Sequence, residues 1–145
     1  MQEFPHHYQV ATKATAEGPV TLSGEDLPPL ETAPPKEFGG PGGSWSPEAL
    51  LVGAVTDCFI LTFRAIARAS KLEWVDLQCS TEGTLDRVDR VTRFTEFNIT
   101  AQLTVPAGTN TEKAKQLLEK AEANCLVSSS LNSSIHLHAS VETAS

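Results

Sequence analysis

The feature that most constrains the fold is a long apolar stretch, SPEALLVGAVTDCFILTFRAIARAS, at residues 46–70. Ser46 is suited to cap a helix N-terminus, Pro47 to occupy the first helical position, and Glu48 to face the positive end of the helix dipole. We therefore predict a helix from Pro47 to about Ser70. Its apolar positions cover nearly the whole circumference, so most of its sides must be buried.

This stretch approaches the length of a membrane span, because residues 50–67 amount to about the 18 residues that raise that question. Asp57 and Arg64 lie within it, however, and two charges at mid-depth would be costly in lipid. We predict a helix buried in protein and no membrane partner. A helix of this length, roughly 36 Å, is hard to enclose in one small domain. Part of its apolar surface is therefore expected to meet a second subunit, which predicts a homodimer.

The remaining segments predict an α+β domain. Residues 8–14 and the run PVTLSG after Gly18 suggest a hairpin. The Pro- and Gly-rich residues 26–43 predict a long loop with a brief edge strand near Leu30. Residues 74–85 and 94–105 read as strands joined by a charged DRVDR turn. Thr111 can cap a helix, EKAKQLLEKAEAN, and a helical turn, LVSSSL, and a last strand, SIHLHASVE, complete the chain.

Length and charge limit the class of protein. A chain of 145 residues suits a single domain, residues 1–145, with one core. The net charge is −7, and the densest run of arginines, at 87, 90 and 93, is interrupted by aspartates, so no nucleic-acid partner is expected. The N-terminus lacks a signal-peptide pattern, and three cysteines, an odd number, do not suggest a disulfide scaffold. Both observations predict a reducing, cytoplasmic location.

The cysteines carry the chemistry that the sequence suggests. Cys58 lies inside the long helix and Cys125 lies in the turn NCLVSSSL. Two thiols in dissimilar settings are the minimal equipment for attack by one and resolution by the other, provided that the fold brings them together. Backbone N–H groups at the turn could stabilise a Cys125 thiolate. Cys58 gets no such help from its own chain, so its positive or hydrogen-bonding partner must come from elsewhere.

Glu48 is the polar residue on the long helix that could join such a site. Ten positions separate it from Cys58, which amounts to about 15 Å of helix rise, so the two cannot touch within one subunit. If both belong to one site, the helix must pack antiparallel against its two-fold mate. That packing would place Glu48 of one chain near Cys58 of the other.

The motif SPEALLVGAVTDCF, followed by EKAEANCLVSSSL and an alternating last strand, resembles the osmotically inducible and organic hydroperoxide resistance family, OsmC/Ohr. The resemblance implies an OsmC-like fold, with antiparallel sheets around a long central helix in an intertwined homodimer. It implies a thiol peroxidase that reduces organic hydroperoxides without a cofactor or metal. By the same resemblance Cys58 attacks the peroxide and Cys125 resolves the sulfenic acid. A dithiol, in the family often a lipoylated protein, would then reduce the disulfide.

The sequence departs from the family at one residue. Glu48 matches the glutamate that orients an arginine toward the attacking thiol, but this chain has no arginine before Arg64. Lys36 lies near the position where one branch carries that arginine, and Lys13 is a more distant candidate. A lysine supplies positive charge without the planar fork of a guanidinium. The resemblance therefore names Cys58, Cys125, Glu48 and Lys36 as the site.

Other interpretations stay open. The loss of the arginine fits a redox-sensing or ligand-binding protein on the same scaffold, with little peroxidase turnover. Cys58 and Cys125 could instead be structural, as Cys79 in its strand-like run is expected to be. Glu48 has a complete explanation as a first-turn helix acid. The pair His136 and His138 lacks a third metal ligand, which favours ordinary surface histidines.

Overall fold

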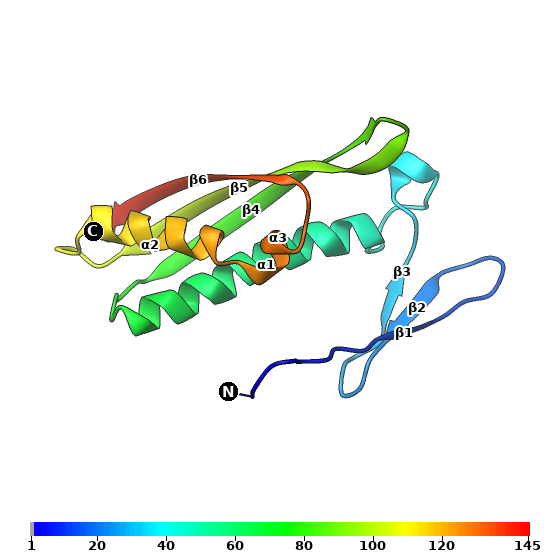
Figure 1. The fold of residues 1–145 in the computed structure, drawn as a ribbon, viewed down its shortest axis with the longest axis horizontal. Coiled ribbons are helices and arrows are strands. Elements are labelled where there is room, and N and C mark those ends of the chain that lie inside the picture. The colour runs from blue at the N-terminus through cyan, green and yellow to red at the C-terminus, as the bar shows by residue number, and fades with distance from the viewer. Residues whose placement is uncertain (1) are drawn as a thin grey trace. The chain divides into compact units, whose positions relative to one another are not determined.

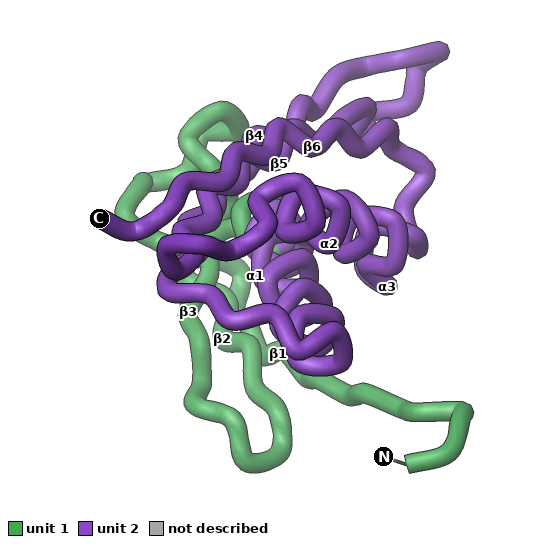
Figure 2. Tube along the Cα trace, turned by 90° about the vertical axis from the view of Figure 1, so that its left-hand side faces the viewer, with its two compact units in different colours: residues 1–50 green, residues 51–145 purple. Residues whose placement is uncertain are grey.

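The computed structural model describes residues 2–145 and divides the chain into two compact units, residues 1–50 and residues 51–145, coloured separately in Figure 2. Three helices, a short 3₁₀ turn and two three-stranded sheets form the described part of the chain (Figure 1). The predicted α+β class with a long helix and two sheets is confirmed. The single domain over residues 1–145 stays a prediction.

The N-terminal unit is built on a small antiparallel sheet. Its strands are β1 (Ala11–Lys13), β2 (Val20–Ser23) and β3 (Leu30–Thr32), in the order β1-β2-β3. Both the expected hairpin and the brief edge strand are therefore present. The loop after β3 contains the 3₁₀ turn η1 (Lys36–Phe38) and is closed by a hydrogen bond of 3.0 Å from the Ala33 N–H to the Trp45 carbonyl.

The long helix α1 (Pro47–Ala69) begins as the sequence predicts. The Ser46 hydroxyl accepts a hydrogen bond of 3.0 Å from the backbone N–H of Ala49, which satisfies one of the free donors at the helix start. The helix ends one residue before the expected Ser70. Lys71 takes a left-handed conformation, φ 57°, and the Leu72 N–H bonds back to the Ala67 carbonyl at 2.9 Å, which closes the last turn.

The larger sheet consists of β4 (Asp76–Val88), β5 (Val91–Val105) and β6 (Ser134–Thr143). The central strand β5 pairs antiparallel with β4 and parallel with β6. The predicted five-residue turn DRVDR is wrong, because only Asp89 and Arg90 form the turn, with φ 51° and 69°. Two left-handed residues match the twist of the flanking strands. Asp86 and Arg93 therefore pair across the ladder as opposite charges instead of lying in a loop.

Two further helices lie between β5 and β6. The helix α2 (Thr111–Ala123) is capped one residue earlier than expected, because the Asn110 side chain, and not that of Thr111, accepts from the Lys113 N–H at 3.1 Å. Asn is a stronger N-cap than Thr, which explains the difference. The short helix α3 (Leu126–Ser129) follows with Cys125 as its N-cap residue, as the motif LVSSSL predicts.

The core of residues 51–145 lies between the larger sheet and two helices that cover the same face of it, α1 and α2 (Figure 1). Among the described residues, α1 is the one helix long and apolar enough to cross a membrane by length and composition. One stripe of it nevertheless belongs to the protein core. The fully buried residues of this core include Val55, Phe59, Phe63 and Ala67 of α1, Phe97, Leu103 and Val105 of β5, and Ala114, Leu118 and Ala121 of α2.

Candidate active site

The fold brings together the two cysteines that are 67 positions apart in sequence. Cys58 lies in the middle of α1, and Cys125 lies at the N-terminal end of α3. Both are free thiols, and they are close enough for the Cys125 thiol to hydrogen-bond to the Cys58 sulfur. Cys125 is fully buried, whereas Cys58 is partly exposed. The condition for two-cysteine chemistry, spatial contact within one chain, is therefore met.

The environment of Cys58 favours its thiolate. Burial by itself would raise the pKa of this thiol, but hydrogen bonds from the Val127 N–H, the Cys125 thiol, the Thr62 hydroxyl and the Leu126 N–H outweigh it and lower the pKa. The Cys58 sulfur lies 3.9 Å from the Thr62 oxygen, one helical turn along α1. Cys58 is therefore the thiol better prepared to act as a nucleophile.

The donors to Cys58 come from the first turn of α3. The first N–H groups of a helix have no partner within the helix, so those of Leu126 and Val127 are free to face the sulfur. The expectation that Cys58 receives no such help from its own chain is therefore wrong. The sequence predicts N–H donors at Cys125, where the Ser128 N–H does lower the pKa. That the first N–H groups of α3 also serve Cys58 depends on how α3 packs against α1, which the sequence does not reveal.

The environment of Cys125 has the opposite effect. Burial raises the pKa of the Cys125 thiol, and the adjacent Cys58 raises it further, while the hydroxyl and N–H of Ser128 lower it without compensating. Two neighbouring thiols thus have pKa values that are displaced in opposite directions. Such a pair is suited to divided roles, in which the exposed thiol reacts first and the buried one follows.

The third cysteine behaves as a core residue. Cys79 lies on β4 and packs at the edge of the hydrophobic core, opposite Ala101. Burial raises the pKa of its thiol to about 11, which leaves it almost entirely protonated at neutral pH. The packing role expected from the sequence is consistent with this position.

Glu48 lies in a separate setting within the N-terminal unit. It belongs to the first turn of α1 and lines an apolar cavity of about 470 Å³ together with Val20, Leu22, Thr32 and Phe38. Its Oε1 atom is buried and has no hydrogen-bond partner among the described residues. A carboxylate oxygen in this state calls for a donor or a cation, which the described part of a single chain does not supply.

The candidate cation Lys36 does not meet Glu48 in this structure. The side chain is exposed and its methylene groups lie over Gly42. Lys36 is not among the residues that line the cavity, although its neighbours Pro35 and Phe38 are. Across residues 2–145 no lysine or arginine lies within 4.0 Å of a carboxylate oxygen, and the one basic side chain that does is His136, beside Glu96. The more distant candidate, Lys13, is exposed on β1.

The histidine pair lies on the outer face of the larger sheet. His136 faces Glu96 at 3.5 Å, and the Nε2 atom of His138 lies 3.1 Å from the Asn98 side-chain oxygen. No group of three or more His, Cys, Asp or Glu residues within the described residues is arranged to hold a metal ion. This arrangement agrees with the interpretation of both as surface histidines.

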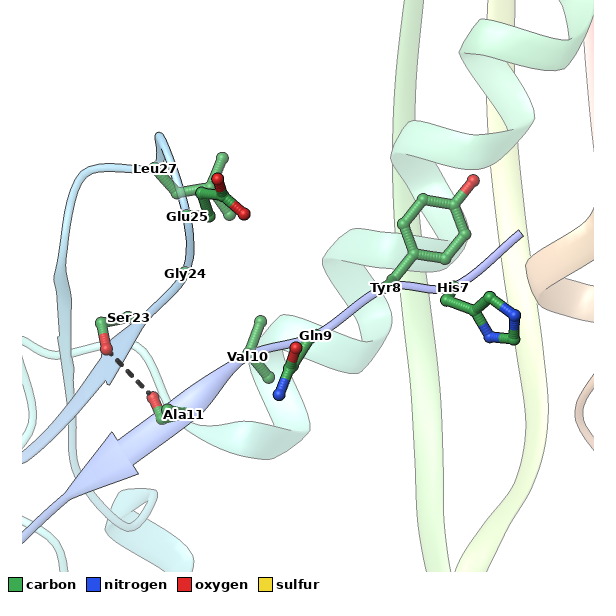
Figure 3. A pocket seen from close by; sticks show the side chains of 9 residues that line it. All are labelled: His7, Tyr8, Gln9, Val10, Ala11, Ser23, Gly24, Glu25 and Leu27. Atoms are coloured by element: carbon green, nitrogen blue, oxygen red, sulfur yellow. Dashed lines mark hydrogen bonds between the residues drawn. The ribbon is translucent and has the colours of Figure 1, made fainter. Parts of the chain in front are cut away.

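A second cavity of the N-terminal unit, of about 680 Å³, lies between the segment before β1 and the loop after β2 (Figure 3). Its lining includes His7, Tyr8, Glu25 and Leu27 but no cysteine. Tyr8 is largely exposed. Thiol chemistry therefore has no place in this cavity.

Comparison with known proteins decides the family. Residues 40–140 match the family described as OsmC-like protein. The chain belongs to the OsmC-like family. This OsmC-like chain is also 31% identical over 106 residues to the uncharacterized protein YmaD of Bacillus subtilis, a match that covers 71% of each chain. The resemblance seen in the motifs around Cys58 and Cys125 is therefore confirmed.

Solved structures of low identity share the fold. An OsmC-like protein of unknown function from Vibrio cholerae has a TM-score of 0.85 at 13% identity, covering 94% of this chain and 100% of that one. An organic hydroperoxide resistance protein from Legionella pneumophila has a TM-score of 0.75 at 24% identity, covering 97% and 99%. Another organic hydroperoxide resistance protein, from Elizabethkingia anophelis, has a TM-score of 0.75 at 19% identity, covering 97% and 100%. The OsmC-like fold is therefore established.

Two residues of the thiol site, Thr62 and Ser128, were not predicted from the sequence. Thr62 follows Cys58 by four positions, the spacing that places side chains on one helix face. Ser128 follows Cys125 by three positions, the spacing at which a third helical residue reaches back toward its cap. Both spacings are visible in the sequence, and they could have been noticed once each cysteine was assigned to a helix.

Proposed function

We propose that this OsmC-like protein is a thiol-dependent peroxidase that reduces organic hydroperoxides to alcohols. The observation that carries the proposal is the contact between Cys58, whose pKa is lowered by hydrogen bonds that outweigh its burial, and the buried thiol of Cys125. Two solved relatives of the same fold bear the name organic hydroperoxide resistance protein. The family and the thiol geometry thus support the same chemistry from independent directions.

The proposed cycle uses both sulfurs. The Cys58 thiolate attacks the distal oxygen of the hydroperoxide, the O–O bond breaks, and the leaving alkoxide takes a proton to become the alcohol. The resulting Cys58 sulfenic acid is attacked by the Cys125 thiolate, which forms the disulfide and releases its oxygen as water. An external dithiol then reduces the disulfide by thiol exchange. A lipoylated protein or a small dithiol is the reductant class that we propose.

The assignment of the first step to Cys58 rests on access and charge. Cys58 is the more exposed of the two sulfurs, and its thiolate is stabilised by donors from α3. Cys125 is fully buried, and its raised pKa disfavours it as the first nucleophile. Leu61, exposed on α1 three positions after Cys58, would suit an organic hydroperoxide better than hydrogen peroxide, whereas Phe59 and Phe63 are fully buried in the core.

The proposal includes a homodimer in a reducing, cytoplasmic environment. Leu61 of α1 is 57% exposed. Only 17% of the most apolar 18-residue stretch of α1 is buried within one chain. Covering such a surface with a second copy would follow from the hydrophobic effect. In the dimer, Glu48 of one chain would approach Cys58 of the other, with Lys36 as the candidate cation in place of an arginine.

The test is consumption of cumene hydroperoxide by the purified protein with excess dihydrolipoamide. Wild-type protein is expected to turn over many times, and Cys58→Ser is expected to fall to the background rate because it removes the attacking sulfur. In the absence of dithiol, Cys125→Ser should consume about one equivalent and remain a sulfenic acid, where wild type forms the disulfide. Cys79→Ala is the matched control and should retain turnover. A Cys58→Ser protein as active as wild type would exclude this mechanism.

A redox sensor is the second candidate, and one observation favours it. No arginine precedes Arg64, and the Glu48 oxygen has no partner among the described residues, so the cation of the family site is missing within the chain. A sensor would form one Cys58–Cys125 disulfide per chain and stop. Stoichiometric oxidation without further consumption, in the presence of excess dithiol, would support the sensor over the enzyme.

A further inference from the structure

One buried polar group at the thiol site has no part in the cycle described above, the hydroxyl of Ser128. The residue is 6% exposed, and its oxygen has no aligned hydrogen-bond partner among the described residues. The hydroxyls of the next two residues, both serines, do have hydrogen-bond partners. Ser129 donates to the Cys125 carbonyl at 2.9 Å, and Ser130 donates to the Leu126 carbonyl at 2.8 Å. The Ser128 hydroxyl is therefore buried and uncommitted.

Ser128 lies within one helical turn of Cys125. Ser128 is the third residue of α3 and Cys125 is its N-cap residue. Helical side chains lean toward the N-terminus, so the third position reaches back to the cap. The hydroxyl acts on the Cys125 thiol and lowers its pKa, although burial outweighs it. A thiolate is a much stronger hydrogen-bond acceptor than a neutral thiol, so an uncommitted hydroxyl in this position can turn to the sulfur when Cys125 ionises.

We propose that the Ser128 hydroxyl donates a hydrogen bond to the Cys125 sulfur whenever that sulfur carries negative charge, which makes Ser128 a catalytic residue of the second half of the cycle. The inference rests on the proposed two-cysteine function and assigns a residue to its resolving and reducing steps. Those steps are the ones in which Cys125 must be an anion.

In the resolving step, the Cys125 thiolate attacks the sulfur of the Cys58 sulfenic acid. The S–S bond forms, the S–O bond breaks, and the departing hydroxide takes a proton to become water. A hydrogen bond that lowers the pKa of Cys125 increases its thiolate fraction about tenfold for each pKa unit. The rate constant of the thiolate falls less than that, because its logarithm follows the thiol pKa with a slope of about 0.4–0.5. Ser128 should therefore accelerate this step moderately.

In the reducing step, Cys125 is the leaving group. A thiolate of the reductant can reach the partly exposed Cys58 but not the fully buried Cys125. Attack on the Cys58 sulfur forms a mixed disulfide, and the electron pair of the broken S–S bond departs on Cys125. A donor at that sulfur stabilises the leaving thiolate directly. The larger effect of Ser128 is therefore expected in reduction of the disulfide.

The experiment measures that step alone, in a Cys79→Ala background that leaves two thiols. The disulfide is formed with diamide, and its reduction by dihydrolipoamide is followed by stopped flow. Ser128→Ala is expected to be about tenfold slower, the scale of one hydrogen bond to a charged group. Ser129→Ala is the matched control, with one hydroxyl removed from the next residue of the same helix, and should stay within about twofold.

A second readout separates chemistry from a packing effect. The Cys125 thiolate is titrated by its absorbance near 240 nm with Cys58 replaced by Ser, and Ser128→Ala should move the titration to higher pH. Ser128→Thr keeps the hydroxyl and should restore both the rate and the titration. A Ser128→Ala protein that matches Ser129→Ala in both readouts would overturn the assignment, as would a Ser128→Thr protein as slow as Ser128→Ala.

These measurements do not depend on hydroperoxide. Wild-type protein that forms and reduces the disulfide but consumes no hydroperoxide would contradict the proposed peroxidase while leaving the Ser128 result interpretable. Unchanged rates in Ser128→Ala, in a protein that does consume hydroperoxide, would contradict Ser128 alone.

Discussion

The two units of the chain differ in how they bury apolar side chains. Every fully buried apolar residue of the described chain lies between Val55 and Cys125. The buried residues of the N-terminal unit, Thr32 and Ser46, are both polar. Apolar side chains such as Leu22 line an open cavity there instead. Residues 51–145 thus have an apolar core of their own, whereas the apolar side chains of residues 1–50 line an open cavity.

The same contrast holds for the functional groups. Cys58 receives hydrogen bonds from several groups of residues 51–145, so its thiolate is stabilised by residues of that unit. The Oε1 atom of Glu48 has no such partner among residues 2–145. The groups that act on the Cys58 thiol therefore belong to the larger unit, whereas the proposed role of Glu48 would need a cation or donor that these residues do not place beside it. Each prediction below probes one side of this contrast.

The largest expected effect concerns stability. Phe59 is fully buried in the core, so Phe59→Ala should lower the free energy of unfolding by about 3–5 kcal/mol through lost burial and a residual cavity. Leu22 is only partly buried at the open cavity, and Leu22→Ala should cost about 1 kcal/mol. Urea unfolding followed by circular dichroism measures both values. Equal losses would show that the N-terminal unit is covered as fully as the core, as in a dimer whose partner fills the cavity.

A smaller effect is expected at the thiol. Thr62→Val removes one of the donors that lower the pKa of Cys58, so this pKa should rise and the thiolate fraction below it should fall. The rate with cumene hydroperoxide should drop roughly threefold at neutral pH, recover at high pH, and show a midpoint moved to higher pH. The pH–rate profile of the first step measures this shift.

The matched control for that prediction is Thr56→Val on the same helix. The Thr56 hydroxyl donates to the Val52 carbonyl at 2.9 Å and shares a second hydrogen bond of 2.7 Å with the Thr81 hydroxyl, and neither bond involves Cys58. Its removal should change stability without moving the pH profile. A profile that moves equally in both variants would mean that the midpoint reports helix packing and not the Thr62 hydroxyl.

Most of the fold could be predicted because its signals are local. Ser46 and Pro47 fix the start of α1, and alternation through Phe97, Ile99 and Leu103 identifies a strand with one buried face. The prediction of a five-residue turn was wrong because it rested on charge alone. The backbone of Asp89 and Arg90 forms a tighter turn of two residues. Turn length depends on backbone angles that composition does not reveal.

The site could be predicted less completely because its partners are distant in sequence. The motifs identified Cys58 and Cys125 as a pair, and the structure brings them into contact. The prediction assigned the N–H donors of this turn to Cys125 alone. The Ser128 N–H does serve Cys125, but those of Leu126 and Val127 serve Cys58, because that depends on how α3 packs against α1. Thr62 and Ser128 are common polar residues that gain meaning only from the sulfur beside them. Local patterns find the nucleophiles, and tertiary contacts decide which one is activated.

The smallest effect is expected at Lys36. It tests whether this lysine supplies the cation that Glu48 lacks. An exposed lysine that acts through a screened charge is worth at most about 1 kcal/mol. If Lys36 stands in for the missing arginine, Lys36→Ala should slow the first step about twofold at 0.15 M salt and more at low salt, because screening weakens as the ionic strength falls. Exposed Lys13 provides the control, and Lys13→Ala should leave the rate unchanged. A rate that is unchanged in Lys36→Ala at both salt concentrations would remove Lys36 from the site and leave Glu48 without a cation from this loop.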